Sequence, residues 1–196
     1  MPLENRVDPY GVIITTAARG AWMGNRGLLH DRDRRVHRDW RLKAWLICRL
    51  EFRGRQRNVM TPGFYTELFF LDEATALAAG HRPCFECRRA DYLRFKAAAG
   101  FAETRVAALD EELHGQRLDE TGVKAVWTCE AAALPDGAFV ALNDVPWLKW
   151  RGALYPWRPE GYGPPRPMPS GAVDVLTPRL TIDAIRRGYV PQVSLG

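Results

Sequence analysis

The chain contains few cysteines. Cys48, Cys84, Cys87 and Cys129 are the only ones among 196 residues, too few for the disulfide framework of a small secreted protein. Cys84 and Cys87 lie close together, so they favour metal or redox chemistry in a reducing compartment over a structural disulfide.

Long apolar runs and a targeting segment are also missing. No stretch approaches the roughly 18 apolar residues that a membrane span requires. The first residues, MPLENRVDPYG, lack the basic and then apolar pattern of a signal peptide. We therefore expect a cytoplasmic protein with no membrane partner.

Lysine is rare, at positions 43, 96, 124 and 149 only, so arginine supplies most of the positive charge. The formal net charge is +5, which favours an anionic partner such as nucleic acid. A GC-rich genome would produce the same excess of arginine without any such partner. The oligomeric state is not indicated by the sequence.

The pattern of apolar residues predicts an α+β protein. We expect strands at 12–16, 42–53 and 64–70, a helix between Asp72 as N-cap and Gly80, and two further helices carrying Tyr92 and Val106. From about residue 123, short apolar runs separated by turns predict a small antiparallel meander, a Pro/Gly-rich loop at 158–171, a strand at 172–176 and a closing helix. The predicted division is a zinc-knuckle lobe at 1–120 and an antiparallel sheet at 121–196, which together could form one compact domain.

The pair Cys84 and Cys87 is the most specific chemical signal. Two cysteines three residues apart supply two of the four ligands of a tetrahedral zinc site, and a following helix N-terminus favours their thiolate forms. A redox Cys-x-x-Cys is the alternative, although such pairs typically follow a strand, and here a helix is expected before the pair.

The sequence does not identify the other two metal ligands. His30 and His37 are preferred, because they lie in a polar segment that could turn toward the cysteine pair. The alternative is that both are surface histidines in a basic segment with no role in metal binding. Cys48 is expected to be a buried free cysteine on the apolar face of a strand. Other candidates considered are Asp31, Asp33, His81, His114 and Cys129.

The segment EATALAAGHRPCFEC resembles the second half of the Ada-type zinc-binding domain of bacterial DNA alkylation-repair proteins. The shared pattern is Gly80, a residue, Arg82, Pro83, Cys84, two residues and Cys87. The resemblance covers about fifteen residues and implies that both cysteines are zinc ligands in a DNA-associated protein. It does not extend to the upstream cysteine pair of that family, which includes the methyl acceptor, because RGRQRNVMTPG contains no cysteine.

A basic segment with interleaved aromatic residues precedes the predicted knuckle. Arginine pairs with phosphate and aromatic rings stack on bases, so we expect a nucleic-acid contact surface there. A solvated face with Trp45 in the core is the alternative. The predicted nucleic-acid-binding residues are Arg34, Arg35, Arg38, Trp40, Arg41, Arg82, Arg88 and Arg89.

Glu67 is the candidate catalytic residue if the protein is an enzyme. Its neighbours Tyr65, Leu68 and Phe69 would partly desolvate the carboxylate and raise its pKa, which suits general acid or base work. An edge-strand glutamate paired with an arginine explains it equally well.

The sequence therefore predicts a zinc-containing nucleic-acid-binding protein, with DNA as the favoured partner and DNA repair or modification as its role. One alternative is an enzyme of hydrolase or glycosylase type acting on nucleic acid or nucleotides, with a carboxylate near the metal. The other is a metal-stabilised interaction module that presents Trp157 and Tyr162.

Overall fold

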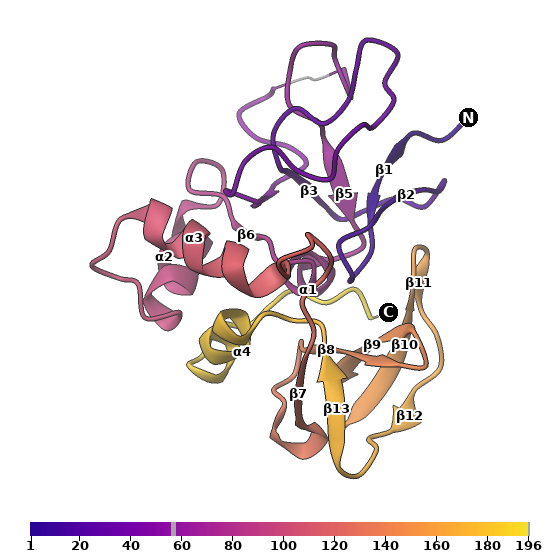
Figure 1. The fold of residues 1–196 in the computed structure, drawn as a ribbon, viewed down its shortest axis with the longest axis vertical. Coiled ribbons are helices and arrows are strands. Elements are labelled where there is room, and N and C mark those ends of the chain that lie inside the picture. The colour runs from indigo at the N-terminus through magenta and orange to yellow at the C-terminus, as the bar shows by residue number, and fades with distance from the viewer. Residues whose placement is uncertain (56–57, 196) are drawn as a thin grey trace.

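The computed structural model describes residues 1–55 and 58–195. Its architecture is α+β, as predicted, and it contains two sheets with a short helix, α1 (Glu73–Ala78), between them (Figure 1). None of the helices in those residues has both the length and the apolar character of a membrane crossing.

The first sheet has the strand order β2-β1-β5-β3-β4-β6. Most neighbours are antiparallel, but β1 pairs with β5 and β4 pairs with β6 in parallel. The strands are β1 (Glu4–Val7), β2 (Ile13–Thr15), β3 (Trp22–Asn25), β4 (Leu46–Cys48), β5 (Leu68–Phe70) and β6 (Arg82–Pro83).

The second sheet is an antiparallel meander with the order β11-β10-β9-β8-β13-β7, and β12 pairs with β10. The meander predicted for the C-terminal part is thereby confirmed. Its strands are β7 (Trp127–Glu130), β8 (Phe139–Leu142), β9 (Val145–Trp150), β10 (Ala153–Arg158), β11 (Gly161–Tyr162), β12 (Arg166–Pro167) and β13 (Ala172–Val175).

Helix α1 (Glu73–Ala78) joins the two halves, and every residue in it is buried. Asp72 caps it, as predicted, by accepting a hydrogen bond from the Thr75 amide, and it also accepts one from the Tyr162 hydroxyl of the second sheet. Trp157, also in that sheet, donates its indole N–H to the Thr75 hydroxyl. Contacts therefore cross the predicted boundary near residue 120 through this helix.

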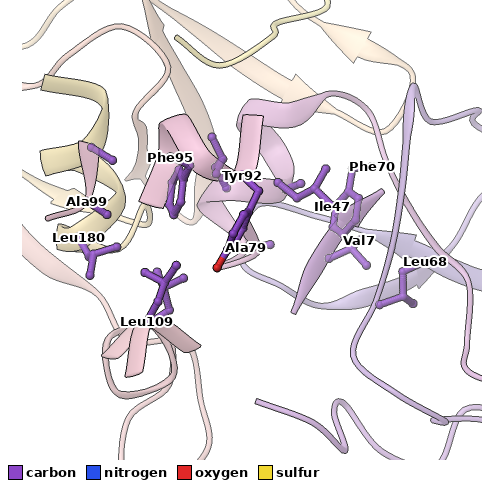
Figure 2. Packing of buried hydrophobic residues seen from close by; sticks show 14 of the residues in the cluster. Val7, Ile47, Leu68, Phe70, Ala79, Tyr92, Phe95, Ala99, Leu109 and Leu180 are labelled. Atoms are coloured by element: carbon purple, nitrogen blue, oxygen red, sulfur yellow. The ribbon is translucent and has the colours of Figure 1, made fainter. Parts of the chain in front are cut away.

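The main core lies between the first sheet and the longer helices. In Figure 2, Phe95, Leu109 and Leu180 come together from three helices, and Ile47 and Phe70 from the sheet lie beyond Tyr92. These helices are α2 (Arg89–Ala98), α3 (Val106–Arg117) and α4 (Arg179–Arg186); a short 3-10 turn, η1 (Ala131–Ala133), precedes β8.

The prediction of a long strand at 42–53 is wrong. Only β4 forms there, and Trp45 and Ile47 are fully buried while Leu42 and Leu50 are half exposed. In this stretch the odd-numbered and the even-numbered residues both include large apolar side chains. The alternation of apolar residues therefore does not indicate which face of the strand points into the core.

Strands form in two segments that contain glycine, and one of them, 158–171, was predicted to be a loop. In the first segment β3 contains Gly24, where a Cβ would lie 2.0 Å from the Leu46 carbonyl oxygen. Glycine is required by this close approach of two strands. In the Pro/Gly-rich stretch, β11 and β12 each pair with β10 over two residues.

Candidate metal centre

Three cysteine sulfurs form a cluster on the first sheet. The Sγ atoms of Cys48, Cys84 and Cys87 all lie within 4.8 Å of one another. Cys48 and Cys84 are buried and Cys87 is half-buried. Among the residues that the structure describes, these three form the group that could hold a metal ion.

Parallel pairing of β4 with β6 builds the cluster. Leu46 lies opposite Arg82 and Ile47 opposite Pro83, so the next position on each strand is a cysteine. The chain then turns from Cys84 toward α2, and the Arg88 amide donates to the Cys84 carbonyl at 3.1 Å. This turn carries Cys87 back beside the other two sulfurs.

The surroundings favour thiolate at Cys84 and thiol at the other two cysteines. Hydrogen bonds from Cys48 and Cys87 lower the pKa of Cys84, and the pKa of Cys48 is raised by its hydrogen bonds to Cys84 and Cys87. The pKa of Cys87 is also raised, because the lowering by Cys48 is outweighed by its hydrogen bond to Cys84 and by burial. The backbone N–H of Arg49 donates to the Cys87 sulfur at 3.4 Å. Three close thiols with an amide aimed at one of them form a donor set that fits zinc.

A cavity of about 120 Å³ adjoins the cluster, and all three cysteines line it. Polar side chains form much of the remaining wall, and the described residues include Asn25, Arg49, Arg55, Tyr65 and Glu86. Arg55 and Glu86 form an ion pair at 2.5 Å. A metal held by the three sulfurs would therefore border a polar space.

His30 and His37 lie outside the cysteine cluster. The His30 ring is buried and its Nδ1 lies 2.6 Å from the Thr66 hydroxyl, while Nε2 faces the Thr61 carbonyl at 3.3 Å. His37 is exposed, and its hydrogen bond lowers the pKa of Asp31 to about 2. Asp33 is exposed beside this pair.

The other candidate ligands also have different surroundings. His81 is fully buried, and its Nε2 accepts a hydrogen bond from Arg26. His114 packs against Trp40 with ring centroids 4.4 Å apart. Cys129 lies on β7 as a half-buried free cysteine.

The predicted nucleic-acid-binding residues divide by exposure. Arg34, Arg35, Arg38, Arg41 and Arg89 are exposed, whereas Trp40 is half-buried. Arg82 is buried and forms a two-pronged ion pair with Asp110, at 2.6 and 2.7 Å. Arg88 is buried between Glu73 and Asp91. The guanidinium groups of Arg82 and Arg88 are thus occupied inside the protein.

Glu67 is buried, and one of its carboxylate oxygens accepts a hydrogen bond from the Met60 amide at 2.8 Å. It is absent from the described lining of the cavity beside the cysteines. The carboxylate that the described lining supplies is Glu86.

Sequence reasoning set Cys48 aside because a buried free cysteine on a strand is common. No local pattern contradicts that interpretation, since Cys48 meets the other two only through the β4–β6 register. A search for any third cysteine near a strand would have kept it among the candidates.

Comparison with protein-family models, with curated proteins and with solved structures gives no match.

Proposed function

We propose that the protein is a zinc-containing nucleic-acid-binding protein that serves DNA repair or modification. The observation that carries the proposal is the convergence of three cysteine sulfurs from two separate segments of the chain. Zinc is the metal that thiolate-rich sites most commonly hold without redox chemistry. The resemblance of residues 73–87 to the Ada-type zinc domain supports the role given to Cys84 and Cys87.

The nucleic-acid part of the proposal is supported by charge. Arg34, Arg35, Arg38 and Arg41 are exposed in one segment, and none of the four forms an ion pair within the described residues. Free guanidinium groups in such number release counterions when they meet phosphates. Affinity should then fall steeply as salt rises.

A metal-dependent enzyme is the second candidate. Structural zinc sites have four protein ligands, whereas catalytic sites keep three and an open position. The described residues supply three cysteines beside a polar cavity. Zinc bound there would supply a Lewis acid, and Glu86 is placed in the same wall to hold or release a proton. Loss of turnover in Glu86→Gln, with zinc retained, would support this candidate.

The proposal is tested by two measurements on protein purified without added metal. Elemental mass spectrometry should find one zinc per chain, and Cys84→Ser should lose it. Fluorescence anisotropy with a labelled 20-base-pair DNA should give a Kd that weakens about 10-fold or more between 50 and 200 mM salt. A metal-free wild type would overturn the zinc site, and an affinity that does not change with salt would overturn the nucleic-acid role.

The matched control for the second measurement is a charge change of equal size elsewhere. Arg34→Gln combined with Arg35→Gln should weaken binding and reduce the salt dependence. Arg151→Gln combined with Arg158→Gln, two exposed positions on the second sheet, should leave both nearly unchanged. Equal effects of the two pairs would locate the contact elsewhere.

A further inference from the structure

An open apolar groove of about 510 Å³ lies next to the cysteine cluster. It shares Leu46, Cys84 and Glu86 with the polar cavity, so the two hollows meet along the β4 and Cys84–Cys87 segments. Its remaining lining includes Phe85, Tyr92 and Val106. Phe85 is 50% exposed, which leaves apolar surface available for a ligand.

The Phe85 ring is fixed in position by its neighbours. It meets Tyr92 edge to face, with centroids 5.3 Å apart and an interplanar angle of 90°. The Arg89 guanidinium lies 4.7 Å from the ring centroid. The groove therefore has a preorganised aromatic side chain with a cation beside it.

The charges around the groove favour an anionic partner. The Glu86 carboxylate is paired with Arg55, and the Arg82 guanidinium in the wall is paired with Asp110. By contrast, the exposed residues Arg49, Arg89 and Arg105 form no ion pair within the described residues. Arg49 lines the adjoining cavity, Arg89 covers Phe85, and Arg105 precedes Val106.

An apolar aromatic surface bordered by unpaired arginines matches the chemistry of a nucleotide. Bases stack on aromatic rings, and the flanking phosphates bind arginine. A paired base cannot enter a groove, because its faces are covered by its neighbours in the stack. A protein segment without acidic side chains would fill apolar space but would leave three guanidinium groups uncompensated.

We propose that this groove binds an unpaired base of single-stranded nucleic acid. The base stacks on the face of Phe85 that Arg89 does not cover, and the phosphates on either side contact Arg89 and Arg49 or Arg105. This inference rests on the proposed nucleic-acid function and adds to it a preference for single-stranded over duplex substrate at the metal centre.

The test compares Phe85→Ala with Phe64→Ala, a second exposed phenylalanine that is absent from the groove lining. Anisotropy is measured with labelled dT12 and with a 12-base-pair duplex, on protein whose zinc content has been checked. Phe85→Ala should raise the Kd for dT12 about 5-fold to 100-fold and change the duplex Kd less than 2-fold. Phe64→Ala should change neither.

The outcomes separate this inference from the function on which it rests. Wild type that binds the duplex, but with Phe85→Ala and Phe64→Ala equal on dT12, would overturn the base site and leave the function standing. Wild type that binds neither probe would overturn both. Arg89→Gln supplies a second readout: it should weaken dT12 binding and lower the salt dependence, and an unchanged salt dependence would also contradict the proposal.

If a second copy of the chain occupied the groove, the protein would be a dimer. Sedimentation of wild type would then give the mass of a dimer, and Phe85→Ala would give the mass of a monomer. That result would overturn the base site, because the same surface cannot be covered by a protein and open to a base.

Discussion

Cys48 faces Cys84 across two parallel strands whose pairing is set by residues without any role in metal binding. Leu46 pairs with Arg82 and Ile47 with Pro83, and Ile47 is fully buried. The position of the third sulfur therefore depends on the core of the first sheet. A one-residue slip of β4 would turn Cys48 to the opposite face of the sheet.

If Cys48 is the third ligand, Cys48→Ser should weaken zinc binding about 100-fold or more, because a hydroxyl is a poor substitute for thiolate at zinc. Cys129→Ser is the matched control, since Cys129 lies on the second sheet outside the cluster. Zinc affinity is measured by competition with a chromophoric chelator. Equal affinity in Cys48→Ser and wild type would show that a metal, if bound, does not use this sulfur.

The sequence predicted those features of the candidate site that depend only on residues close to one another in the chain. Cys84 and Cys87 are three residues apart, and Asp72 and Gly80 mark the ends of α1 through capping and positive φ, which neighbouring residues determine. Cys48 depends on strand pairing with a distant segment, and the sequence pattern around it fits either face of β4. Long-range register was the missing information, and the apolar spacing does not contain it.

The burial of charged side chains could not be predicted from the sequence for the same reason. Arg82 looked like a surface cation beside the knuckle, whereas Asp110 on α3 neutralises it in the interior. Trp45 is buried, as the alternative interpretation of the basic segment expected, and the guanidinium groups of Arg26 and Arg117 lie over its ring, at 3.8 and 4.0 Å from the centroid. Each of these contacts joins residues that are far apart in the sequence, so the residues around either partner do not indicate it.

The buried ion pair of Arg82 with Asp110 leads to a stability prediction. Asp110→Ala should lower the free energy of unfolding by about 3–5 kcal/mol, because it leaves the Arg82 charge buried without a partner. Glu111→Ala, one position along α3, removes an exposed pair with Lys43 and should have little effect. Urea denaturation followed by circular dichroism measures both. Comparable losses in the two variants would mean that Arg82 finds another partner or water.

Gly80 supports the turn that leads into β6. Its φ is +89°, and a Cβ there would lie 2.7 Å from the Cβ and Cδ of Arg117, whose guanidinium also binds the Gly80 carbonyl. Gly80→Ala should therefore cost about 3 kcal/mol or more, from backbone strain and from overlap. Gly188→Ala has a similar φ of +98° with open space around it, so its cost should be about 1 kcal/mol. Thermal unfolding of both variants isolates the overlap, and equal costs would contradict it.

Lys124 should make stability depend on pH. Its ammonium group donates to the Ala78 carbonyl, and burial, together with the charges of Arg26 and Arg117, lowers its pKa from 10.5 to about 7. Between these two values the unfolded chain binds the proton and the folded chain does not. The free energy of unfolding contributed by this group therefore rises with pH from about 7 to 10.5, and below pH 7 its full penalty is present and constant.

Lys124→Met should remove that rise. Relative to wild type, the variant should gain roughly 2–4 kcal/mol on going from pH 10 to pH 7. The hydrogen bond lost to Ala78 is common to both pH values and cancels in the comparison. Lys96→Met is the control, because Lys96 also donates to a backbone carbonyl, that of Ala102, but at the surface. Parallel stability curves for wild type and Lys124→Met between pH 7 and 10 would show that the ammonium group escapes to solvent and is not held inside the fold.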